Sequence, residues 1–181
     1  MKSILAATIL LMLLAACSET YPNRDVVGER FPTVQGNTLA EEPRTIPGDL
    51  VDSAAVFLVG YKQDSQFDID RWLIGLDQTG TRLPAYELPT IQGLFPRMFE
   101  TQIDAGMRRG IPKELWGGVI TIYEDGETVQ RFTGNTNPNN ARVLLVDAAG
   151  TVRWFHDEGF SVPALNGLRA AAEALGGVSV R

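Results

Sequence analysis

The sequence predicts an α/β domain in which a mixed, mostly parallel sheet lies between layers of helices and ends in a β-hairpin followed by a helix. Two apolar runs, at 54–61 and 142–146, suit strands that are buried on both faces. Strand patterns alternate with helical patterns along the chain, which favours parallel pairing through crossover helices. The 181 residues are enough for one domain with its own core.

The folded part is expected to begin with a short strand and a loop. Residues 34–39 suit a strand, and Gly36 and Asn37 within them suit a turn. Residues 41–49 are polar and contain two prolines, so we expect a loop there. The buried strand at 54–61 follows, and its β-branched and aromatic side chains favour extended backbone.

Two amphipathic helices are expected in the middle of the chain. Apolar residues recur with the helical period over 67–77 and over 94–109, and the second of these helices is expected to be the longest. A short strand at 83–88 separates them, and its flanking prolines place it near an edge of the sheet. One helical turn at 112–116 then leads to a strand at 119–123.

The last third of the chain predicts a short helix, a hairpin and a final helix. The short helix covers 124–132, and an asparagine-rich loop separates it from the apolar strand. Residues 147–150 form a tight turn, after which 151–156 returns as the antiparallel partner. Apolar residues at helical spacing predict the final helix around 165–175.

Composition argues against several classes of function. The formal net charge is −6 without a basic cluster, which argues against a nucleic-acid partner. One cysteine and one histidine exclude an intrachain disulfide, a CxxC redox pair and a Cys/His zinc site. The sequence also lacks a Walker loop, GxGxxG and HExxH. We therefore expect no cofactor, no metal site and no catalytic residue of a recognisable type.

The first 17 residues have the pattern of a secretion signal. The apolar run at 4–14 is shorter than the ~20 residues that a transmembrane helix needs, and small residues precede Cys17. Leu14-Ala15-Ala16-Cys17 resembles the bacterial lipoprotein box, which implies removal of residues 1–16 and acylation of Cys17. Several acyl chains give stable anchoring where one is marginal. The alternative is an ordinary signal peptide that ends in an incidental cysteine.

The signal also predicts an address and a domain boundary. Ser18 follows the cysteine, and by resemblance to enterobacterial sorting patterns this favours the outer membrane, facing the periplasm, over the inner membrane. Residues 17–30 have no periodicity and are expected to be a lipidated tether, with 31–181 as the folded domain. The expected partners are the membrane, through the anchor, and a protein of the cell envelope.

Four segments resemble the thioredoxin-like superfamily in its peroxiredoxin-like branch, and the hairpin is the most specific of them. They are Phe31-Pro32 with Gly36 and Leu39, the strand at 55–61, the helix at 125–134 and the hairpin at 143–154. Residues 108–114, followed by that hairpin, resemble more narrowly the mitochondrial ATP-synthase assembly-factor family. The resemblance implies a thioredoxin-like three-layer sandwich and, for the narrower family, a role in assembling a membrane sector.

The residues that carry thioredoxin chemistry are missing. A redox member needs a low-pKa thiolate just after the first core strand, at a helix N-terminus. Here those positions are Lys62-Gln63-Asp64-Ser65-Gln66, and Asn140-Ala141 stands where thioredoxins place a cis-proline. We therefore expect a non-catalytic protein-binding or assembly module. The alternative is a small-ligand or metal-binding protein, or an enzyme of unrecognised type, that uses the vacated pocket.

Two candidate binding residues fall where loops follow the sheet. Asp64 belongs to a group of carboxylates with Asp68 and Asp70, which suits a cation only weakly because the EF-hand spacing is absent. The helix dipole alone explains Asp68 and Asp70. Asn137 lies in the asparagine loop, where open sheets form ligand crevices, although asparagine also suits plain turns.

Two further candidates are aromatic or titratable. Trp116 lies beside two glycines and suits an exposed anchor at an interface. His156 ends the last strand beside Asp157 and Glu158, which suits a base or a metal ligand. A solvent-exposed residue at a strand end is the alternative interpretation of His156.

Overall fold

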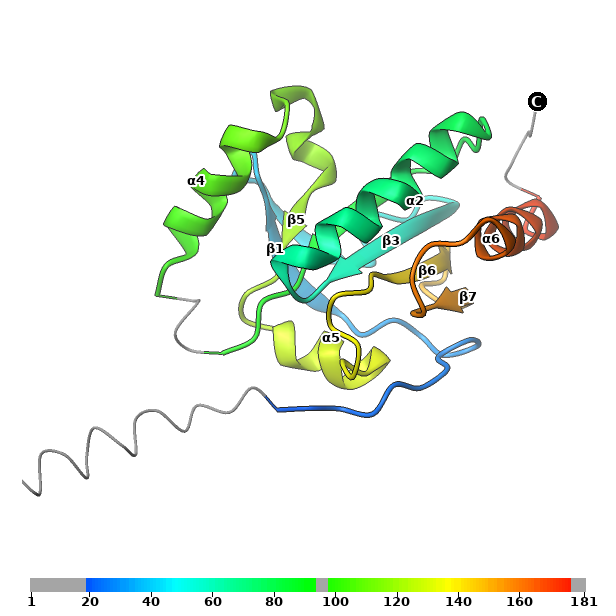
Figure 1. Ribbon diagram of the computed structural model, residues 1–181, viewed down its shortest axis with the longest axis horizontal. Coiled ribbons are helices and arrows are strands. Elements are labelled where there is room, and N and C mark those ends of the chain that lie inside the picture. The colour runs from blue at the N-terminus through cyan, green and yellow to red at the C-terminus, as the bar shows by residue number, and fades with distance from the viewer. Residues whose placement is uncertain (1–18, 94–97, 177–181) are drawn as a thin grey trace, which may run out of the picture.

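The structure is a computed structural model that describes residues 19–93 and 98–176 (Figure 1). The proposed signal with Cys17, the start of the helix expected from residue 94, and residues 177–181 lie outside the described residues. The strands are β1 (Val34–Thr38), β2 (Pro43–Ile46), β3 (Ala54–Gly60), β4 (Ala85–Pro89), β5 (Ile120–Thr121), β6 (Arg142–Asp147) and β7 (Val152–His156). The helices are η1 (Gln63–Ser65), α2 (Gln66–Gln78), α4 (Glu100–Gly110), η2 (Lys113–Gly118), α5 (Gly126–Thr133) and α6 (Val162–Ala174).

The central sheet has the strand order β4-β3-β6-β7. β3 pairs with β4 in parallel, whereas β6 runs antiparallel to β3 and β7 runs antiparallel to β6. Two parallel bridges join β4 to the β5 region, and β5 in turn pairs antiparallel with β1. The α/β class, the mixed sheet, the hairpin and the last helix are confirmed. The balance of strand directions differs from the expectation, because antiparallel pairings outnumber parallel ones among the described strands.

The connection through α5 accounts for this difference. β5 runs in the same direction as β4 and β3, whereas β6 runs in the opposite direction. The chain between β5 and β6 therefore turns back at the end of the sheet where β5 finishes, and α5 is not a crossover helix. Alternation of strands and helices in a sequence does not distinguish a helix that crosses the sheet from one that only turns the chain.

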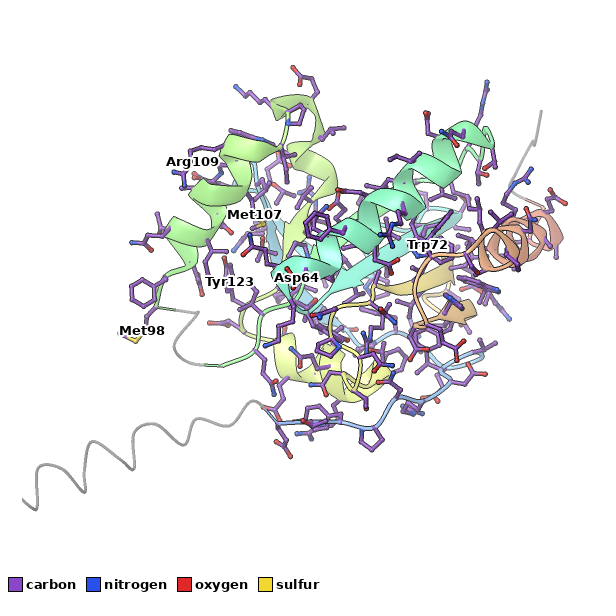
Figure 2. The ribbon with its side chains drawn as sticks, in the orientation of Figure 1. Asp64, Trp72, Met98, Met107, Arg109 and Tyr123 are labelled. Atoms are coloured by element: carbon purple, nitrogen blue, oxygen red, sulfur yellow. The ribbon has the colours of Figure 1, made fainter. Side chains whose placement is uncertain are left out.

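β3 lies at the centre of the core, and all seven of its residues are buried. One face of the sheet packs against α2 and α6, through a cluster that contains Trp72, Leu145 and Leu168 (Figures 1 and 2). The other face packs against α5 and the N-terminal part of the chain, through a cluster that contains Phe31 and Leu144. The sheet is therefore covered on both faces, but one of the covers is mainly strand and extended chain.

Two elements differ from the sequence prediction. Residues 43–46, expected within a loop, form β2 and pair with β1, with prolines at the first residue and just beyond the last, where an N–H is not required. The described part of α4 has 11 residues and none is buried, whereas α2 and α6 have 13 residues each. The apolar period of this segment therefore does not mark a core-facing helix.

Candidate functional site

The turn between β3 and α2 is the position at which the resemblance to thioredoxins places a redox thiolate. Lys62, Gln63 and Asp64 are exposed there, and Ser65 is buried. The Ser65 hydroxyl donates to the carbonyl of Lys62 at 2.6 Å, and a Cβ on Gly60 would lie 2.6 Å from that hydroxyl oxygen. The Ser65 hydroxyl thus closes the turn through a local hydrogen bond, and the turn contains no thiol nucleophile.

Asp68 holds three segments together beneath this turn. Its Oδ2 accepts from the backbone N–H of Ala141 at 2.9 Å, and its Oδ1 accepts from that of Phe160 at 2.7 Å. Ala141 stands where a cis-proline was expected in the family pattern, and a proline has no N–H to donate. The sequence interpretation of Asp68 as a dipole residue is therefore incomplete, because the buried carboxylate links α2 to the segments before β6 and α6.

The N-terminal strap, which we define as residues 19–30, packs along the domain. The Tyr21 N–H donates to Oδ1 of Asn135 at 2.8 Å, and the Asn135 N–H donates to the Tyr21 carbonyl at 3.0 Å. Val26 is completely buried, and the Gly28 N–H donates to Val152 at 2.8 Å. Residues 17–30 were expected to be a lipidated tether outside the folded domain. The described part of this segment, residues 19–30, packs on the folded domain instead.

Gly134 permits the strap to pass closely over the end of α5. Its φ is +78°, and a Cβ at this position would lie 2.3 Å from Cα of Asn23 and 2.4 Å from the carbonyl oxygen of Pro22. Both contacts are with backbone, which has no side-chain rotamer to move away. Only glycine is compatible with the left-handed conformation and this approach together.

We expect Gly134→Ala to detach the strap around Asn23 and to destabilise the domain by about 1–3 kcal/mol. Hydrogen exchange of the Tyr21 amide should accelerate in this variant. The matched control is Gly80→Ala, because Gly80 also has a positive φ of +61° but nothing lies within 4 Å of its Cβ position. Equal exchange at Tyr21 in both variants would contradict the role assigned to Gly134.

Arg142 is a fully buried cation that binds the strap and the asparagine loop. Its guanidinium donates to the carbonyls of Gly134 at 3.2 Å, Asn137 at 2.5 Å and Asn140 at 2.9 Å, and to Oδ1 of Asn23 at 3.2 Å. Burial lowers the pKa of this guanidinium, which nevertheless stays charged at neutral pH. Backbone and amide oxygens thus accept the hydrogen bonds of this guanidinium.

Tyr61 packs against this cation from the end of β3. The Arg142 guanidinium carbon lies 5.0 Å from the centre of the Tyr61 ring, which is a cation–π contact. The Tyr61 hydroxyl donates to the Val129 carbonyl at 3.2 Å and shares a 2.6 Å hydrogen bond with the Thr133 hydroxyl. Burial raises the pKa of Tyr61, so the hydroxyl remains protonated and does not serve as a base at neutral pH.

A pocket of about 310 Å³ opens at this edge of the sheet. Its lining combines the strap, the ends of β3 and β4, α5 and the asparagine loop: Glu19, Thr20, Tyr61, Lys62, Ile91, Gln92, Gln130, Asn135 and Pro138. Gln130 and Asn135 are buried polar residues, and Nδ2 of Asn135 donates to Oε1 of Gln130 at 2.6 Å. The pocket therefore offers amides and hydroxyls, with one ammonium and one carboxylate, and suits a polar ligand or a peptide.

The four candidate residues of the sequence analysis occupy separate places. Asp64 is exposed in η1, just before α2 (Figure 2), and Asn137 is exposed while its carbonyl accepts from Arg142. Neither residue lines the pocket. Gln130, Asn135 and Arg142 were not predicted from the sequence, although an arginine directly before the apolar run 143–146 is a signal that the sequence contains.

Trp116 and His156 are bound within the fold. The Trp116 Nε1 donates to the Ile111 carbonyl at 2.9 Å, and the Arg108 guanidinium lies 5.8 Å from the ring centre. The His156 Nε2 lies 2.7 Å from the Gly159 carbonyl, and its ring stacks on Trp154 at 5.8 Å. Within the described residues, no group of three or more His, Cys, Asp or Glu side chains is arranged to hold a metal ion.

Comparisons with known proteins agree with this architecture. No family model matches the chain, and no curated protein matches it. A thiol peroxidase from Chromobacterium violaceum has a similar structure, with a TM-score of 0.57 and 11% identity over 86% of this chain and 92% of its own. A thio-disulfide isomerase from Thermus thermophilus gives a TM-score of 0.55 and 17% identity over 83% of this chain and 96% of its own.

A third similar structure is Arabidopsis thaliana ScoI with copper bound, with a TM-score of 0.53 and 10% identity over 79% of this chain and 98% of its own. Identities this low define the fold alone. The chain thus has a thioredoxin-like fold. Its described helices include none with both the length and the apolar character that a membrane crossing requires.

Proposed function

We propose that this protein is a lipid-anchored protein of the cell envelope whose thioredoxin-like domain binds a protein partner without redox chemistry. The observation that carries the proposal is the turn between β3 and α2, which has Asp64 and Ser65 where a redox domain needs a thiolate. The single cysteine of the sequence is Cys17, in the segment that resembles a lipoprotein box. We therefore assign the domain to the binding of a protein partner and the Cys17 thiol to acylation.

The α4–η2 surface, formed by residues 100–118, is the proposed partner surface. It projects from the side of the sheet in Figure 1, and its helix contributes no buried residue to the core. Arg108 is engaged within the fold, donating to the Leu39 carbonyl at 2.7 Å and pairing with Glu41 at 3.2 Å. Arg109 and Leu115 are exposed, so they are the residues proposed to contact the partner. This surface contains the segment that resembles the assembly factors.

Photocrosslinkers at Arg109 and Leu115 in native envelopes test this surface. We expect one partner in a fixed ratio at both positions, and its capture should be lost when Arg109→Glu is combined with a crosslinker at 115. A crosslinker at Asp77, which is exposed at the end of α2, is the control position. Equal capture at Asp77, or capture that survives Arg109→Glu, would contradict the assigned surface.

A small polar ligand in the pocket is a second candidate function, favoured by the volume of about 310 Å³ and by the buried amides of Gln130 and Asn135. Native mass spectrometry of the purified protein distinguishes the two. A stable low-molecular-weight adduct that Gln130→Leu abolishes would support ligand binding, and its absence would favour the protein partner.

The anchor gives a direct prediction. We expect the mature protein to partition into detergent, because acyl chains on Cys17 would bind it stably to the bilayer. Cys17→Ser should remove acylation and move any exported protein to the soluble periplasmic fraction. A Cys17→Ser protein that remains bound to membranes after a salt wash would disprove the anchor.

The chemistry gives a second prediction. The full chain should neither reduce insulin disulfides nor turn over peroxide with thiols, because its one sulfhydryl would be acylated and the turn after β3 has none. The assay compares wild type with Ser65→Ala, which removes the buried hydroxyl and should have the same baseline. Turnover clearly above buffer in protein freed of contaminating enzymes would overturn the non-redox assignment.

A further inference from the structure

The strap places the pocket edge of the domain close to the proposed anchor. Glu19 is two residues beyond Cys17 in the sequence, and two extended residues span only about 7 Å. Glu19 is held on the domain, since its carbonyl accepts from Nδ2 of Asn135 at 2.9 Å and its carboxylate accepts from the Tyr21 hydroxyl at 2.9 Å. An acylated Cys17 would therefore hold this edge at the lipid headgroups.

Two exposed apolar side chains lie at the same edge. Tyr61 and Lys62, which follow β3, line the pocket together with Glu19. α2 begins a few residues later, and Phe67 in the first turn of α2 is 68% exposed. Met98, just before α4, is also 68% exposed. The start of α4 is fixed near the end of β5, because the Tyr123 hydroxyl donates to the Glu100 carbonyl at 3.3 Å and to Oδ1 of Asp104 at 2.8 Å.

Topology accounts for this gathering. β3, β4 and β5 run parallel, so the segments that follow them emerge at one edge of the sheet. Figure 2 places Met98 at the side of the molecule where the described chain begins. The anchor would confine both side chains near the bilayer, which gives them a high effective concentration at the lipid surface.

We propose that Met98 and Phe67 form a second membrane contact, in which both side chains enter the lipid interface and hold the pocket edge of the domain toward the bilayer. This inference depends on the proposed acylation of Cys17. The transfer of large apolar side chains from water into this interface is favourable. The carboxylates of Glu19 and Asp64 and the single ammonium of Lys62 lie at the same edge and leave it without a net positive charge, so attraction to anionic headgroups does not drive the contact, and it should persist at high salt.

Spin labels test this orientation in the full, acylated chain. The protein is placed in nanodiscs of phosphatidylethanolamine and phosphatidylglycerol in equal parts, and Met98→Cys or Phe67→Cys supplies a free thiol because acylation occupies Cys17. We expect a nitroxide at 98 and at 67 to be more accessible to oxygen than to a water-soluble nickel complex. The matched controls are Ile74→Cys and Leu115→Cys, which are 55% and 57% exposed in the native protein.

The controls are expected to have the reverse accessibility, because Ile74 lies about two turns along α2 and Leu115 lies at the amino end of β5, away from this edge. Water-like accessibility at 98 and 67 in an anchored protein would overturn the membrane contact alone. Low accessibility to both reagents would indicate a protein contact and would also overturn it. Failure of the wild-type chain to partition into detergent would overturn the anchor and this inference together.

Discussion

Leu144→Ala and Leu145→Ala are each expected to destabilise the domain by about 2–5 kcal/mol, the usual range for truncation of a buried leucine. Both side chains are completely buried, although they are adjacent in β6 and point to opposite faces of the sheet. Leu144 packs in the cluster with Phe31 and Phe57, and Leu145 packs in the cluster with Trp72 and Leu168. Each substitution therefore leaves a cavity in a different layer.

Denaturant unfolding of the two variants measures the effect. Val162→Ala is the control, because Val162 is 62% exposed and its truncation should change the free energy of unfolding by less than about 0.5 kcal/mol. A silent result for either leucine would mean that one face of β6 is open to solvent. The losses are expected to be nearly additive if the two layers respond independently, which the double variant tests.

Arg142→Leu is expected to destabilise the domain by about 3–5 kcal/mol, because it leaves several acceptors at a buried site without a donor. The affected oxygens are the carbonyls of Gly134, Asn137 and Asn140 and Oδ1 of Asn23. The strap should detach at the same time. Thermal unfolding gives the loss of stability, and hydrogen exchange of the Thr136 amide, which donates to Oδ1 of Asn23 at 2.8 Å, reports the strap.

Two further substitutions separate charge from geometry. Arg142→Lys keeps the positive charge but lacks the planar fork of donors, so an intermediate loss is expected. Arg131→Leu removes an exposed arginine whose ion pair with Glu127 lies on the surface, and it should change the stability far less than Arg142→Leu does. A loss for Arg142→Leu as small as that for Arg131→Leu would show that water replaces the guanidinium without cost.

Local pattern was sufficient for the central elements. Seven consecutive buried residues in β3 and the four from Val143 to Val146 in β6 follow directly from apolar runs that only a doubly covered strand requires. The turn at 147–150 was readable because Asp147 and Gly150 have the side-chain and backbone properties of a tight turn, and Oδ1 of Asp147 indeed accepts from the Ala149 and Thr151 amides. The absence of a cysteine after β3 could be read directly from the sequence, because its one cysteine is Cys17.

The site was not predictable in this way. Tyr21 and Asn135 are separated by 114 residues, and no local propensity indicates that the Tyr21 backbone pairs with the backbone N–H and the side-chain oxygen of Asn135. The tether expected at 17–30 had no periodicity, but an extended segment that is paired by long-range contacts has none either. The pocket depends on the same contacts, since the strap supplies one of its walls.

By itself, then, the sequence determined which strands are buried, where the hairpin turns and that the thioredoxin-like fold lacks its thiol, because burial, turn chemistry and composition are properties of neighbouring residues. The tertiary structure alone decided the direction of β6, the docking of the strap and the role of Arg142. These features arise where distant segments satisfy each other's buried polar groups, and a donor in one segment specifies no partner until the fold has brought the acceptor within reach.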